Sequence, residues 1–93
     1  MVVAYRKFVV NPSVVCAELE NEAVLLDVET GVYYGLDVIG SQIWELLSQG
    51  AAQEEIVDKL LAEYDVAPSQ LGADVETFLA TLSEKGLLKI EGE

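Results

Sequence analysis

The stretch AVLLDVETGVYYGL (residues 23–36) contains two apolar runs on either side of a turn, and it decides how the chain begins to fold. Both runs are rich in the β-branched and aromatic residues that favour strands, and the first covers 23–28. In the segment ETG (29–31), the glycine can supply the positive φ of a three-residue hairpin loop, which requires antiparallel strands. A further strand is predicted upstream over VVCAEL (14–19), joined to the hairpin by ENE (20–22). The sequence therefore predicts a three-stranded antiparallel sheet.

Two adjacent tyrosines stand in the last of these strands, VYYGL. Successive side chains of a strand point to opposite faces. Tyr34 is in phase with Val32 and Leu36, so we predict that it packs toward the rest of the molecule. Tyr33 should lie on the outer face, and Gly35 contributes no side chain there.

From Val38 onward the apolar residues recur at helical spacing, and three helices are predicted. The first ends before Gly50, which suits the C′ position, and the second has two glutamates in its first turn, where the helix dipole favours them. The third begins near Pro68 and ends at Gly86, and LLKI (87–90) then predicts a short strand. The apolar stripes are Ile39, Ile43, Trp44, Leu46 and Leu47 in the first helix; Ile56, Val57, Leu60, Leu61 and Tyr64 in the second; and Leu71, Val75, Phe78, Leu79 and Leu82 in the third.

The order of elements predicts an α+β fold, in which a three-stranded antiparallel sheet packs on three helices. The segment AYRKFVV (4–10) fits either a fourth strand or an extended arm, stopped by Asn11-Pro12. Because 93 residues leave room for one core, we predict a single domain over 1–93, with 1–12 as an arm or extra strand. Three helices followed by a strand is also the order of a winged helix-turn-helix, a class that usually binds DNA.

Charge narrows the possible partners. Seventeen acidic and five basic residues give a net charge of −12, which repels nucleic-acid phosphates and favours encounter with a basic peptide or protein face. No apolar run approaches the roughly 20 residues that cross a bilayer, and the start of the sequence lacks a signal-peptide pattern. We therefore expect a cytoplasmic protein whose partners include neither nucleic acid nor membrane.

Catalytic chemistry finds little support in these residues. The sequence has no histidine, so Cys16 would lack the usual base for a thiol nucleophile, and in a strand we expect it to be packed and inert. Carboxylates are numerous enough for acid-base chemistry or Mg²⁺, but they are scattered. Neither a calcium loop nor a glycine-rich phosphate loop is present. We expect no enzymatic activity, no metal and no cofactor.

Binding is the remaining function, and the strand over 32–36 is the best candidate for it. If this strand lies at the edge of the sheet, its unpaired N–H and C=O groups can accept an extended peptide as a further strand. Pockets between the strand and the third helix would supply specificity. The same residues could instead be core, and the edge could join two copies as a homodimer; the pattern leaves both alternatives open.

Three segments taken together resemble a known family: VLLDVETGVYYGLDVIGSQIWELLSQG (24–50), EEIVDKLLAEYDV (54–66) and DVETFLATLSEKGLL (74–88). The family is that of the PqqD-like recognition elements of ribosomally synthesised and modified peptides (RiPPs), and the resemblance extends over roughly residues 14–90. The combination of GVYYGL with IW is most similar to the freestanding leader-binding proteins of lasso-peptide biosynthesis. The resemblance implies a three-stranded antiparallel sheet packed on a three-helix winged helix-turn-helix.

The function implied by the resemblance is that of a non-catalytic adaptor, which binds the leader of a precursor peptide as a strand added beside the third helix. A separate leader cysteine protease and an ATP-dependent cyclase would act on the presented peptide. One alternative is a peptide chaperone for a radical SAM enzyme, as in pyrroloquinoline-quinone biosynthesis; a winged-helix DNA-binding regulator fits the charge less well. Carried over by position, the peptide-binding residues are Val32, Tyr33, Tyr34, Gly35, Leu36, Leu71, Asp74, Val75 and Phe78.

Overall fold

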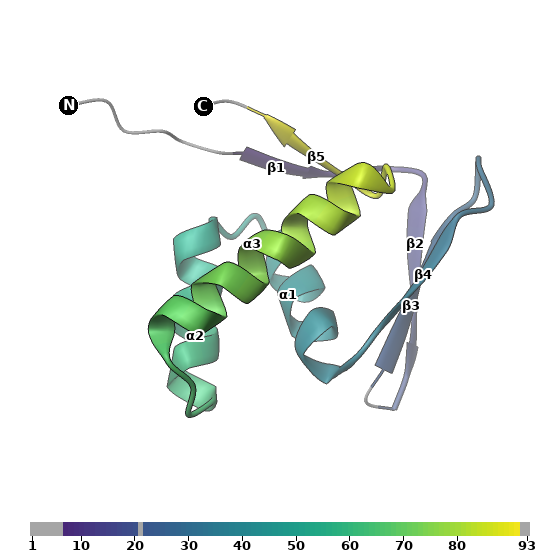
Figure 1. Cartoon of the computed structure of the whole chain (residues 1–93). Coiled ribbons are helices and arrows are strands. Elements are labelled where there is room, and N and C mark those ends of the chain that lie inside the picture. The colour runs from purple at the N-terminus through teal and green to yellow at the C-terminus, as the bar shows by residue number, and fades with distance from the viewer. Residues whose placement is uncertain (1–6, 21, 92–93) are drawn as a thin grey trace.

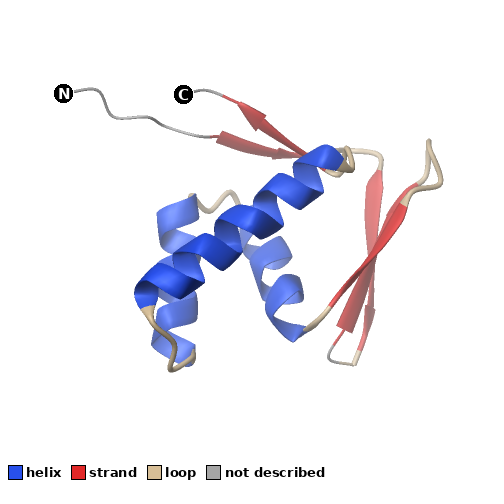
Figure 2. Cartoon of the chain, viewed as in Figure 1, coloured by secondary structure: helices blue, strands red, loops and turns tan. Residues whose placement is uncertain are grey.

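A computed structural model of the chain describes residues 7–20 and 22–91, which form three helices and two small sheets (Figure 1, Figure 2). In Figure 1, α3 crosses in front of the other helices, the larger sheet lies to one side, and the pair of β1 and β5 lies above. The predicted α+β class is confirmed. The elements in chain order are β1 (Lys7–Val10), β2 (Val14–Leu19), β3 (Glu22–Asp27), β4 (Tyr33–Leu36), α1 (Val38–Ser48), α2 (Gln53–Glu63), α3 (Pro68–Glu84) and β5 (Leu88–Glu91).

The larger sheet has the strand order β2-β3-β4 with antiparallel pairing, as predicted. Its strands differ from the predicted bounds by one residue at most. The hairpin turns at Gly31, whose φ of +81° is the positive value that the loop requires. The buried carboxylate of Asp27 stabilises this turn, because its Oδ1 accepts hydrogen bonds from the backbone N–H groups of Glu29 at 2.9 Å and Thr30 at 3.4 Å.

The N-terminal segment forms a strand, but this strand does not join the larger sheet. β1 pairs antiparallel with β5, with Val10 opposite Leu88. Residues 4–6 of the predicted segment lie outside the described residues. Asn11 then connects the two sheets, since its side-chain amide donates to the carbonyl of Gly86 at 2.9 Å and to the carboxylate of Asp27 at 3.2 Å.

Helices α1 and α3 end just before the predicted glycines, and α1 begins with an N-cap that was not predicted from the sequence. Asp37 caps α1, with its Oδ1 accepting from the N–H of Gly40 at 2.7 Å. Gly50 and Gly86 follow α1 and α3 with φ of +87° and +75°, a left-handed conformation that suits glycine. After Gly86, the backbone N–H of Leu87 donates to the carbonyl of Leu82 at 3.0 Å, so the chain folds back on the end of α3.

The core lies between the helices and the inner faces of β3 and β4. Tyr34 packs against this core, whereas Tyr33 is 73% exposed on the opposite face, so the predicted division between the tyrosines is confirmed. Ile39 departs from the predicted stripe, because it lies in the first turn of α1, where no element covers it fully, and is 39% exposed. The buried apolar residues are Ala23, Leu25, Leu36, Ile43, Trp44, Leu47, Ile56, Leu60, Leu71, Val75, Leu79, Leu82, Leu87 and Leu88.

The prediction that Cys16 is packed is wrong. Cys16 lies on β2 opposite Leu25 and therefore on the same face of the sheet, but Leu25 is buried and Cys16 is exposed. The reason is that the helices pack mainly against β3 and β4, leaving the outer strand uncovered. Partial burial, followed by the carboxylate of Glu18, raises the pKa of the Cys16 thiol.

Candidate functional site

One edge of β4 has no strand beside it among residues 7–20 and 22–91, because β4 pairs only with β3. The backbone N–H of Asp27 donates to the carbonyl of Val32 at 2.8 Å, which sets the phase of the ladder. In an antiparallel pair, alternate residues direct both backbone groups to the same neighbour. Tyr34 therefore bonds toward β3, and the N–H and C=O groups of Tyr33 and Gly35 point to the free edge.

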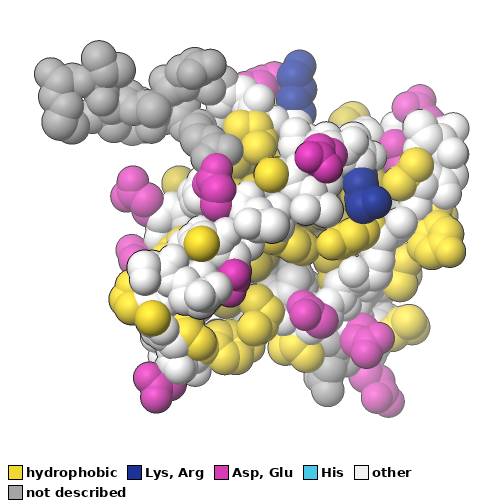
Figure 3. Space-filling model, viewed as in Figure 1, with side chains coloured by type: hydrophobic (Ala, Val, Ile, Leu, Met, Phe, Trp, Pro, Cys, Tyr) yellow, Lys and Arg dark blue, Asp and Glu magenta, His cyan; other side chains and the backbone are white. Residues whose placement is uncertain are grey.

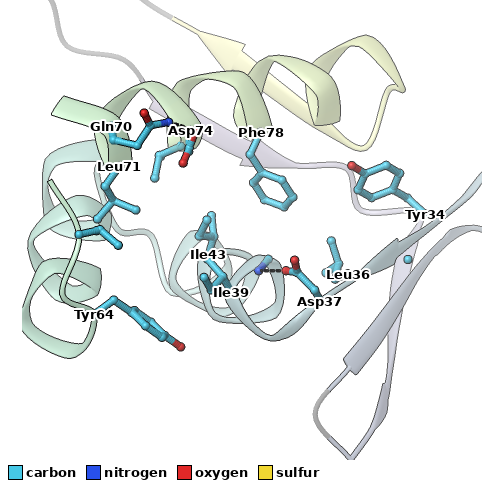
Figure 4. Close-up of a pocket in the computed structure, with 14 residues that line it drawn as sticks. Tyr34, Leu36, Asp37, Ile39, Ile43, Tyr64, Gln70, Leu71, Asp74 and Phe78 are labelled. Atoms are coloured by element: carbon cyan, nitrogen blue, oxygen red, sulfur yellow. Dashed lines mark hydrogen bonds between the residues drawn. The ribbon is translucent and has the colours of Figure 1, made fainter. Parts of the chain in front are cut away.

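The free edge borders a hollow of about 470 Å³ between β4, α1 and α3. Figure 4 shows Tyr34 and Phe78 at one end and Tyr64 with Leu71 at the other. In Figure 3, hydrophobic side chains (yellow) gather in the recess beneath α3 on the side facing the larger sheet. The residues that line the hollow are Tyr34, Gly35, Leu36, Asp37, Ile39, Gly40, Ile43, Tyr64, Val66, Gln70, Leu71, Asp74, Val75 and Phe78.

Seven of the nine residues predicted to bind peptide line this hollow: Tyr34, Gly35, Leu36, Leu71, Asp74, Val75 and Phe78. Leu36, Leu71 and Val75 are buried and also belong to the core, so they form the floor. Tyr34 and Phe78 are half-buried and form walls. The other two predicted residues lie elsewhere, since Tyr33 points to the outer face and Val32, 38% exposed, lies in the hairpin loop.

The far end of the hollow was missed by the sequence prediction. It is formed by the first turns of α1 and by the link between α2 and α3, and the lining residues not predicted are Asp37, Ile39, Gly40, Ile43, Tyr64, Val66 and Gln70. Gly40 permits close packing here, because a Cβ at this position would lie 3.2 Å from Oδ1 of Asp37. Tyr64 is held in place by its hydroxyl, which donates to Oε1 of Gln42 at 3.0 Å. The only signal in the sequence for this part of the hollow was a helix-capping residue followed by an apolar first turn. That signal does not distinguish a residue that lines a hollow from one that fills the core.

Charged groups of both signs lie in or beside the hollow. Near Tyr34, the ammonium of Lys85 lies 5.5 Å from the centre of the tyrosine ring, which is within range of a cation–π contact. The carboxylates of Asp37 and Asp74 line the hollow, and Figure 4 shows Asp37 beside Leu36 and Asp74 beside Gln70. Oδ1 of Asp74 accepts a hydrogen bond from the side-chain amide of Gln70 at 2.9 Å.

The described part of the chain contains no group of three or more His, Cys, Asp or Glu side chains that could hold a metal ion. Across 7–20 and 22–91, no helix combines the length and the apolar character needed to cross a membrane. The site is thus characterised by a free strand edge beside an apolar recess.

A free sheet edge beside an apolar recess is the geometry of a peptide-binding module. The profile of the coenzyme PQQ synthesis protein D (PqqD) family matches residues 22–88, and the chain belongs to this family. No curated protein sequence matches the chain. The resemblance drawn from the sequence is confirmed, and it rests on residues in both the sheet and the helices.

Two solved structures resemble the chain over most of its length. One is TbiB1 in complex with the TbiA(beta) leader peptide, which shares 45% identity at a TM-score of 0.82, covering 86% of this chain and 93% of TbiB1. The other is a lasso peptide synthetase B1 complexed with the leader peptide, with 26% identity and a TM-score of 0.81, covering 87% of this chain and 95% of that one. The predicted similarity to the leader-binding proteins of lasso-peptide biosynthesis is confirmed, and both of these relatives were solved with a leader peptide bound.

Proposed function

We propose that the protein is a non-catalytic adaptor in lasso-peptide maturation, which binds the leader of a ribosomally synthesised precursor as a strand added to β4. The observation that carries this proposal is the free edge of β4 beside an apolar hollow walled by α3. The similarity to two B1 proteins solved with leader peptides supports the same function.

The added strand would pair with the backbone of Tyr33 and Gly35, whose N–H and C=O groups point to the free edge. Alternate side chains of the leader would then enter the hollow, and those between them would stay at the outer face. An apolar anchor that fills the space between Tyr34 and Phe78 would contribute about 2 kcal/mol, or roughly thirtyfold in affinity. Main-chain pairing supplies affinity in this mechanism, and the hollow supplies specificity.

The chain would act as a single domain with the helix order of a winged helix-turn-helix, used to bind peptide rather than DNA. In α3, the helix that would enter a DNA groove, Asp74, Glu76 and Glu84 are acidic, and the basic Lys85 follows only after the end of the helix. Because a single cysteine suits a reducing compartment and the substrate is made on ribosomes, we place the adaptor in the cytoplasm. A separate cysteine protease and an ATP-dependent cyclase would act on the presented precursor.

Titration of a fluorescently labelled leader, taken from a precursor encoded beside this gene, tests the proposal. The wild type should bind, and Phe78→Ala should bind roughly thirtyfold more weakly. The matched control is Phe8→Ala, because the second phenylalanine of the chain lies on β1, outside the hollow. Absence of binding by the wild type would contradict the proposed function, and equal losses in both variants would contradict the proposed groove.

A further inference from the structure

The hollow beside β4 is polarised along its length. The ammonium of Lys85 lies over the ring of Tyr34, beside the hollow but not among its lining residues, whereas the hollow itself is lined by the carboxylates of Asp37 and Asp74. A strand lying along β4 would pass Tyr34 and then Asp37, which directly follows β4, so its side chains would meet opposite charges at different positions. The polarity can therefore select the charge pattern of the peptide.

Lys85 is well placed to receive a ligand charge. Its backbone position is fixed at the end of α3, where its N–H donates to the carbonyl of Thr81 at 3.1 Å and the next residue is the left-handed Gly86. Among the described residues, no carboxylate forms an ion pair with Lys85, and its ammonium lies over the ring of Tyr34. The charge thus lies beside Tyr34, a wall of the hollow, and no carboxylate within 7–20 and 22–91 forms an ion pair with it.

We propose that Lys85 is a specificity-determining residue that selects an acidic side chain on the leader, at the strand position beside Tyr34. This inference rests on the proposed leader-binding function. The net charge of −12 repels acidic groups from most of the surface, and Asp37 and Asp74 repel them from the rest of the hollow. The positive charge of Lys85 offsets this repulsion at one position of the bound strand only. Acidic residues of the leader are therefore accepted at that position and disfavoured elsewhere.

The expected effect is modest, because Lys85 is exposed and its charge is partly screened by water and salt. One exposed ion pair corresponds to about a fivefold change in affinity at most. The preference should weaken as the salt concentration rises, whereas contacts made by apolar anchors should persist. Salt dependence therefore separates this contribution from packing.

A charge-swap experiment tests the proposal, with the TbiA(beta) leader peptide as the probe. Each position of the peptide is replaced in turn by Glu, Gln and Lys, and binding is measured for the wild type, Lys85→Glu and Lys85→Met. Lys89→Glu is the matched control, because Lys89 is an exposed lysine on β5, outside the hollow, and the substitution changes the net charge by the same amount.

The wild type should prefer Glu to Lys at one position, by about fivefold. Lys85→Glu should reverse that preference, Lys85→Met should abolish it, and Lys89→Glu should preserve it. Unchanged charge preferences in a Lys85→Glu protein that still binds, or an equal shift in Lys89→Glu, would overturn the role of Lys85 alone. If the wild type binds neither this leader nor its own, the proposed function itself fails.

Discussion

The two sides of α3 differ in how completely they are covered. On the core side, Leu79 and Leu82 have no exposed surface. On the hollow side, Phe78 is half-buried and Asp74 is exposed, although Phe78 and Leu79 are neighbours in sequence. The same helix therefore contributes to the core with one side and lines the hollow with the other, and the apolar stripe by itself does not distinguish the two sides.

Removing a large side chain from each side of α3 in turn tests this difference in burial. The substitution on the core side has the largest expected effect on stability. Leu79→Ala should lower the free energy of unfolding by about 3 kcal/mol, because it leaves a cavity among fully buried side chains. Phe78→Ala should cost clearly less, since half-burial gives it fewer packing contacts in the absence of ligand. Urea unfolding of both variants measures the difference, and equal costs would mean that the hollow side is as much core as the other.

The next test concerns the turn that positions β4 against the hollow. Asp27→Ala should destabilise the fold by about 2 kcal/mol, because it removes the acceptor of the Glu29 N–H and one of the two acceptors of the Asn11 side-chain amide. Glu29→Ala in the same loop is the control, since its exposed side chain makes none of these bonds. Thermal unfolding compares the two, and a similar small change in both would show that the Asp27 network does not hold the hairpin.

A smaller effect, on binding rather than folding, is expected at the free edge itself. Gly35→Pro removes an N–H that points away from β3, so leader affinity should fall by about tenfold while the ladder with β3 is retained. Gly35→Ala keeps the N–H, and its Cβ would meet nothing within 4 Å, so its affinity should match that of the wild type. Leader titration and circular dichroism of both variants check binding and folding separately. Undiminished binding by a folded Gly35→Pro protein would place the leader elsewhere.

Local chemistry made much of this fold predictable. The positive φ at Gly31 and Gly86 and the opposite orientations of Tyr33 and Tyr34 follow from turn preferences and strand alternation. What could not be predicted depends on which part of each face a distant element covers. Pairing of β1 with β5 brings the two ends of the described chain together, and Ile39 lines the hollow instead of filling the core. Periodicity identifies which face of an element is apolar, but it does not show how much of that face a neighbouring element covers.

The reactivity of Cys16 shows whether β2, at the opposite edge of the sheet, is covered or exposed, and this prediction has the smallest expected effect. Its thiol faces the helix side of β2 but remains exposed, and partial burial together with Glu18 raises its pKa. Because the thiolate is the reactive form, alkylation by iodoacetamide near neutral pH should be slower for the folded protein than for the unfolded chain. Glu18→Gln removes a nearby negative charge, so the pKa should fall and the rate should rise, whereas Glu20→Gln should leave the rate unchanged. If the alkylation rate depends on pH identically in the wild type and in Glu18→Gln, the carboxylate of Glu18 does not act on this thiol. If Cys16 is protected from alkylation at every pH, β2 is covered rather than exposed.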